Sequence, residues 1–167
     1  MKFYIKERMW TLREELVVRD EGGQPVFQVK GKFFHIGDNL RLIDEASREE
    51  VAHIKQKVIS LTGHYEIYRD GAHWASLHET LLHFFGERFK IKLESGETYH
   101  IQGNIWNWDF TVTDGQGNLL AEISKRISLF ADSYGVDIAR DSDVPLLISL
   151  AIVIEMIRHH HAEKERA

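Results

Sequence analysis

Histidines and carboxylates are the residue types in this chain that could do chemistry, and the segment "HETLLH" brings them close together. It places His78 and His83 five residues apart, one residue more than the H-E-x-x-H pattern of zinc peptidases requires. Histidines four apart share one face of a helix, whereas five apart they are separated by about 140° around the axis. In a strand they face opposite sides. The spacing therefore favours a half-buried strand over a zinc site.

Other catalytic patterns are absent or incomplete in the sequence. A hydrolase could use His35 or His73 with a nearby carboxylate, but the sequence offers no support for this beyond residue type. The "GQGN" segment lacks the third glycine of a dinucleotide-binding motif, and it precedes a second strand rather than a helix. The sequence contains no P-loop and no G-x-S-x-G motif. We therefore expect no enzymatic activity, no cofactor and no metal.

Composition and charge narrow the classes of partner. The chain has 167 residues, a formal net charge of -5 and no cysteine, which excludes disulfides and thiolate chemistry. It shows no basic stripe of the kind that displaces counterions from nucleic acid, so we expect no nucleic-acid partner. The first residues, "MKFYIKERMW", lack the apolar run of a signal peptide. These features predict a cytoplasmic location.

Short alternating segments separated by acidic and glycine turns predict a meander of β-hairpins. Three hairpins repeat one pattern, in which an aspartate precedes the turn and a basic residue follows an apolar one by three positions. The aligned triplets are Asp20, Val29 and Lys32; Asp44, Ile54 and Lys57; and Asp114, Ile123 and Arg126. Positions three apart face opposite sides of a strand. We therefore expect the apolar members to point inward and the basic members to point outward.

The segment "PLLISLAIVIEMIRHHH", residues 145 to 161, breaks this β pattern. Asp141, Ser142 and Asp143 offer N-cap oxygens and Pro145 suits a first helical turn, so the segment predicts a helix over about 144–158. Its apolar residues cover nearly every direction around the axis, which means that the helix must be enclosed. As far as Ile157 it is only about 18 Å long, against roughly 30 Å of bilayer hydrocarbon.

A sheet curled around this helix would bury both the inner face of the sheet and the whole helix. Closure would also remove the exposed strand edges that many hairpins otherwise present. We therefore predict a mainly β fold, a closed antiparallel barrel of about 12 strands around a central C-terminal helix. The barrel forms one domain, residues 1–158. Residues 159–167, which include His159, His160 and His161, are expected to be a solvated tail.

Four segments together resemble the LURP-one-related family over essentially the whole chain. They are "VVRDEGGQPVFQVKGKFFHIGDNLRLID", "IKQKVISLTGHYEIYRDG", "ISKRISLFADSYGVDIA" and "VPLLISLAIVIEMI". The family is similar to the Tubby C-terminal domain and to the phospholipid scramblases. The resemblance implies a twelve-strand barrel around a central helix, and it implies a membrane or phospholipid as partner. It supplies no catalytic motif and no lipid-binding lysine that matches a residue here.

A filled barrel leaves its outer wall and loops for recognition. The expected anion-facing or lipid-facing residues are Lys30, Lys32, Lys55, Lys57 and Arg126. In "NIWNWDF", Trp106 and Trp108 have the same parity, opposite to Ile105 and Asn107. If the segment is one strand with Ile105 and Asn107 inward, both indoles are exposed or half-exposed and form a contact surface.

These observations favour a non-catalytic binding or scaffold module that recognises phospholipid headgroups or a membrane surface through the barrel exterior. A cytoplasmic protein of this kind would be peripheral at the membrane. The alternatives are a protein-interaction or regulatory module without a lipid ligand, a scramblase-like effector that inserts its helix into a bilayer, and a hydrolase.

Overall fold

A computed structural model describes residues 1–6, 15–32, 37–58, 63–80, 87–104, 107–128 and 133–166. Within these ranges the chain forms twelve strands, a short 3-10 helix η2 (Lys125–Ile127) and one long helix α1 (Val144–Arg166). The strands are β1 (Lys2–Lys6), β2 (Glu15–Asp20), β3 (Pro25–Lys32), β4 (Asn39–Asp44), β5 (Glu50–Gln56), β6 (His64–Arg69), β7 (Ala72–Glu79), β8 (Glu87–Leu93), β9 (Thr98–Asn104), β10 (Asp109–Thr113), β11 (Leu119–Ser124) and β12 (Ser133–Ile138).

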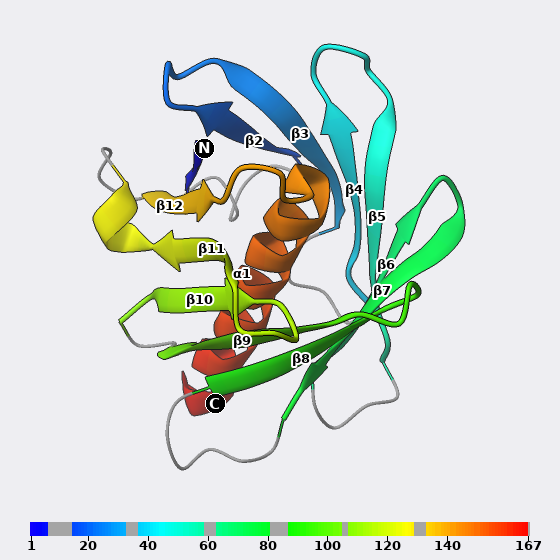
Figure 1. Cartoon of the computed structure of the whole chain (residues 1–167), viewed down its shortest axis with the longest axis vertical. Coiled ribbons are helices and arrows are strands. Elements are labelled where there is room, and N and C mark those ends of the chain that lie inside the picture. The colour runs from blue at the N-terminus through cyan, green and yellow to red at the C-terminus, as the bar shows by residue number, and fades with distance from the viewer. Residues whose placement is uncertain are drawn as a thin grey trace.

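Each strand pairs antiparallel with the strands before and after it, and β1 pairs with β12, so the sheet closes into a barrel. Figure 1 shows this wall wrapped around α1. The closing pair aligns Phe3 with Val136 and Ile5 with Tyr134. Alternate side chains of the strands point inward and are buried, as the period of two predicts. The predicted closed barrel is confirmed.

The repeated hairpins have the predicted internal structure. The side-chain oxygens of Asp20, Asp44 and Asp114 accept hydrogen bonds from backbone N–H groups of their turns, with donor–acceptor distances of 2.7–3.0 Å. Val29, Ile54 and Ile123 are fully buried, whereas Lys32, Lys57 and Arg126 are exposed. An aspartate that fixes the turn therefore also sets which side chains of the next strand face the core.

Helix α1 lies inside the barrel, as its apolar pattern predicts. Every residue from Leu146 to Ile157 is buried, including Ser149, whose hydroxyl donates to the carbonyl of Pro145 at 2.7 Å. Asp143 accepts a hydrogen bond from the backbone N–H of Leu146 and also binds the Arg69 guanidinium through both carboxylate oxygens, at 2.8 and 2.9 Å. This cap fixes where the helix enters the barrel. Among the described residues, no helix combines the length and hydropathy needed to cross a membrane.

The predicted end of the helix at residue 158 is wrong, because α1 continues to Arg166. His160 and His161 are half-buried, not part of a solvated tail. His160 Nε2 lies 3.1 Å from Asp38 Oδ2, and His161 Nε2 lies 2.9 Å from Glu79 Oε1. The polar histidines extend the helix because buried carboxylates at this end of the barrel give them partners.

Candidate functional site

The outer face of β3–β9 carries lysine and histidine side chains in two neighbouring rows set by the strand register. In the first row, Lys32 on β3 lies opposite Asn39, Asn39 opposite Lys55, and Lys55 opposite Glu66. The same row continues through Ser76 on β7 to Lys92 on β8. Adjacent strands lie about 4.8 Å apart, so these side chains form a continuous surface.

The second row lies one step further along the same strands. It begins at Lys57, whose backbone N–H donates to the carbonyl of His64 at 2.9 Å. His64 lies opposite His78, His78 opposite Lys90, and Lys90 opposite His100 on β9. We call the basic side chains of both rows the basic wall; they are Lys32, Lys55, Lys57, Lys90, Lys92, His64, His78 and His100. Among the residues just named in these two rows, Glu66 carries the one carboxylate.

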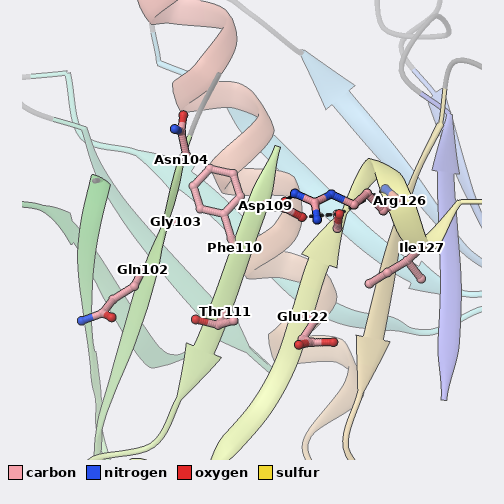
Figure 2. A pocket seen from close by; sticks show the side chains of 10 residues that line it. Gln102, Gly103, Asn104, Asp109, Phe110, Thr111, Glu122, Arg126 and Ile127 are labelled. Atoms are coloured by element: carbon pink, nitrogen blue, oxygen red, sulfur yellow. Dashed lines mark hydrogen bonds and ion pairs between the residues drawn. The ribbon is translucent and has the colours of Figure 1, made fainter. Parts of the chain in front are cut away.

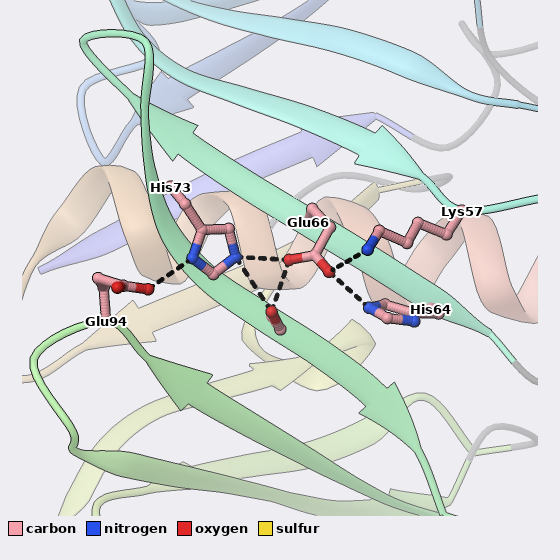
Figure 3. Close-up of polar contacts among 6 residues, drawn as sticks. Lys57, His64, Glu66, His73 and Glu94 are labelled. Atoms are coloured by element: carbon pink, nitrogen blue, oxygen red, sulfur yellow. Dashed lines mark hydrogen bonds and ion pairs between the residues drawn. The ribbon is translucent and has the colours of Figure 1, made fainter.

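Glu66 is buried at the centre of the basic wall and is bonded on both oxygens (Figure 3). Oε1 lies 2.7 Å from His64 Nε2 and 3.3 Å from Lys57 Nζ. Oε2 accepts a hydrogen bond from the Ser76 hydroxyl at 2.5 Å and lies 2.5 Å from His73 Nε2. Burial alone would raise the pKa of Glu66, but these hydrogen bonds outweigh it and lower the pKa to about 2. The carboxylate is therefore ionised and orients four neighbouring donors.

His73 lies in an array that resembles a Ser-His-Glu triad, the arrangement that the hydrolase alternative would need. Its Nε2 lies 3.1 Å from the Ser76 hydroxyl, and its Nδ1 lies 2.8 Å from Glu94 Oε2. Hydrogen bonds to Glu94 and Glu66 raise the pKa of His73 against the opposing effect of burial. A general base must be neutral to accept the serine proton. Two carboxylates that raise the pKa of His73 favour its charged form, so this arrangement favours a network of ion pairs over an activated serine.

The five cations predicted from sequence are only partly brought together. Lys32, Lys55 and Lys57 belong to the basic wall. Lys55 Nζ lies 5.0 Å from the centre of the Tyr68 ring. Lys30 lies outside the two rows, opposite Arg41, and its Nζ is 3.6 Å from a carboxylate oxygen of Glu15. Arg126 follows β11, six strands from β5 in the closed order, and therefore lies on the far side of the barrel. Sequence reasoning missed the other five members of the basic wall: Lys90, Lys92, His64, His78 and His100.

Arg126 borders a hollow of about 850 Å³ on β9–β11, whose lining includes the apolar side chains of Phe110 and Ile127 as well as polar groups. Its guanidinium forms an ion pair with Asp109, which also accepts a hydrogen bond from Ser124. Figure 2 shows Gln102, Thr111 and Glu122 side by side on neighbouring strands of this face. The hollow thus combines amide, hydroxyl and carboxylate groups, and the guanidinium at its border is already paired with a carboxylate. Its chemistry differs from that of the basic wall.

The predicted exposure of Trp108 is wrong. Its side chain is buried, stacked on Tyr134 with ring centroids 4.4 Å apart, and the Arg158 guanidinium lies 5.1 Å from its ring centre. The segment is not one strand, since β9 ends at Asn104 and β10 begins at Asp109. Trp108 itself has a left-handed backbone with φ of 52°, so strand parity does not apply. Trp106 lies outside the described residues.

The comparison with protein families matches this architecture and sequence. The model of the family described as LURP-one-related matches residues 1–155. The chain belongs to the LURP-one-related family. One relative that aligns over nearly its full length is the uncharacterised protein YxjI of Bacillus subtilis, which is 30% identical over 164 residues and 98% of each chain.

A solved structure shows the same fold for a plant protein. The X-ray structure of an Arabidopsis thaliana protein superposes with a TM-score of 0.67, covering 92% of this chain and 89% of that chain at 15% identity. The LURP-one-related family and the barrel fold fit a non-enzymatic module.

Proposed function

We propose that this LURP-one-related protein is a peripheral binding module that recognises anionic phospholipid headgroups through the basic wall. The observation that carries the proposal is the register of the two rows, which gathers five lysines (Lys32, Lys55, Lys57, Lys90 and Lys92) around one buried carboxylate. Positive side chains at a membrane surface are attracted by the negative potential of anionic lipids. A cytoplasmic protein with this wall would bind an anionic membrane from the inner side.

The charge distribution supports this surface over others. The chain as a whole carries -5, so a locally positive face is a departure from the average of the molecule. Glu66 offsets one of the five lysine charges of the two rows, and both of its oxygens already have partners among His64, His73, Ser76 and Lys57. Lys90 and Lys92 are both exposed on β8 and point to the same side. They are the side chains best placed to meet an external anion.

The helix that fills the barrel interior also favours a ligand bound on the outside. The helix residues Leu146 to Ile157 are buried within the barrel, whereas barrels that hold small ligands leave an open interior. Burial of this segment argues against insertion of the helix into a bilayer, as the scramblase-like alternative would require. Binding through the outer wall needs no such rearrangement.

Co-sedimentation with vesicles of phosphatidylglycerol in phosphatidylcholine, against phosphatidylcholine alone, tests the proposal. At physiological salt, the double variant Lys90→Gln/Lys92→Gln should weaken binding to the anionic vesicles by about 30-fold, because each lysine near such a surface contributes about 1 kcal/mol. Raising the salt concentration should weaken binding of the natural protein as well.

The matched control is Lys125→Gln/Arg126→Gln, which removes the same charge just after β11, three strands from β8 in the closed order. Binding of this variant should stay within about twofold of the natural protein, since the Debye length at physiological salt is about 8 Å. Equal loss in both double variants, or equal binding to both vesicle types, would contradict a lipid surface at the basic wall. Negligible binding to either vesicle would favour the protein-interaction alternative.

A further inference from the structure

His78 occupies a special position in the basic wall because most of the groups that face it are positive. It lies half-buried on β7 between β6 and β8. Its ring lies 4.0 Å from the His64 ring, centroid to centroid, with the planes tilted by 46°. Lys90 lies opposite it on β8. The groups that act on it electrostatically are His64 and Glu66 from β6, Lys57 after β5 and Lys92 from β8.

These surroundings disfavour the protonated form of His78. Burial lowers its pKa, and the positive charges of His64, Lys92 and Lys57 lower it further, while Glu66 acts in the opposite direction. Glu66 cannot bond another donor easily, since both of its oxygens already have partners among Lys57, His64, His73 and Ser76. A new negative charge nearby would therefore favour a proton on His78.

We propose that anion binding at the basic wall is coupled to the uptake of a proton by His78, so that the wall binds anionic surfaces more tightly as the pH falls. This inference rests on the proposed function and names its regulation. An anion seated beside Lys90 and Lys92 lies next to His78 on the neighbouring strand and stabilises the imidazolium. By linkage, a proton on His78 strengthens anion binding by the same factor.

The change of vesicle affinity with pH depends on how many protons are taken up when the anion binds. One coupled proton changes the binding constant by at most about tenfold per pH unit. The contribution of His78 is measured as a difference between variants, because the other histidines beside it, His64, His73 and His100, are the same in all of them.

The test measures the dissociation constant for phosphatidylglycerol vesicles at pH 5.5, 6.5 and 7.5 and fixed ionic strength, with circular dichroism as a check of folding at each pH. The lipid phosphodiester keeps its charge over this range. Relative to the natural protein, His78→Gln should reduce the strengthening between pH 7.5 and 5.5 by about tenfold. His78→Lys, which adds a positive charge at this position near neutral pH, should bind more tightly than the natural protein at pH 7.5.

A nuclear magnetic resonance titration of the His78 ring with and without sulfate, a free anion of constant charge, gives a second measurement without a membrane. The midpoint should rise when sulfate is added. An unchanged midpoint, or the same pH dependence of vesicle binding in the natural protein and in His78→Gln, would overturn the coupling. Absence of vesicle binding at every pH would instead contradict the proposed function, and the sulfate titration would then decide the coupling by itself.

Discussion

Glu66 is a single buried carboxylate that organises the basic wall. Taking a carboxylate out of water is costly unless it is paired and hydrogen-bonded, and Glu66 meets this condition with partners on β6, β7 and the residue after β5. The lysine and histidines it holds are thereby fixed on the outer face. An acidic residue, Glu66, therefore holds basic side chains of the wall in place.

Replacing Glu66 with Gln should lower the free energy of unfolding by about 1–3 kcal/mol at pH 7, because it removes charged hydrogen bonds from several partly buried donors. The pKa of Glu66 is lowered from 4.5 to about 2 by folding, so its contribution is present above pH 4.5 and is lost as the pH falls towards 2. The difference between variant and natural protein in urea unfolding should therefore shrink between these pH values.

Glu94→Gln is the control for this prediction. Glu94 contacts the same histidine, His73, but its side chain is 71% exposed, so its loss should cost less than about 0.5 kcal/mol. Equal costs for the two substitutions, or a Glu66→Gln cost that stays constant down to pH 2, would show that Glu66 does not stabilise the wall.

Residue-scale predictions from the sequence succeeded where they needed only local parity. Lys32, Lys57 and Arg126 are exposed, as their hairpin pattern predicts. Lys90 and Lys92 have equally clear parity in "FKIKL", but their place beside His78 and Ser76 depends on register between β7 and β8. A single sequence does not give that register, which also shifts at a bulge between β6 and β7. The prediction for Trp108 failed because a turn, not a strand, precedes Asp109.

At the scale of elements, the two ends of α1 were not equally predictable. Its start carries local signals, an aspartate cap and a proline in the first turn, and these predict it correctly. Its continuation past Ile157 depends on Asp38 and Glu79, which are about 120 and 80 residues earlier in the chain. In the sequence these polar residues have no neighbouring partner and therefore predict a solvated tail. For this reason the predicted end of the helix, at residue 158, is too early.

Removing residues 159–167 should destabilise the barrel by about 1–3 kcal/mol, because buried Asp38 and Glu79 would lose the histidines that contact them. Thermal unfolding followed by circular dichroism measures this. A chain that ends at Ala162 keeps both histidine contacts and serves as the control, with a midpoint close to that of the whole chain. If both truncated chains unfold at the same temperature as the whole chain, the histidine contacts contribute nothing to stability.

At the scale of the whole molecule, the closed barrel could be predicted because two independent sequence patterns are both satisfied by the same arrangement. A helix that is apolar on all sides needs enclosure, and a sheet of many hairpins needs closure of its edges. The aligned rows of side chains that define a surface depend on strand register and on closure, which places β11 across from β5. For this reason the sequence grouped Arg126 with Lys55, although the barrel separates them.

If the basic wall is the lipid-binding surface, its strands approach the membrane and the strands on the other side of the barrel do not. Mapping which strands lie near the membrane tests this most directly. Phosphatidylglycerol vesicles that carry a gadolinium-labelled lipid broaden the amide signals of nearby residues. We predict selective broadening on β5–β8, at Lys55, Ser76, Lys90 and Lys92, with sharp signals on β10–β12. Broadening concentrated around Glu122 and Arg126, or uniform over the barrel, would contradict this claim.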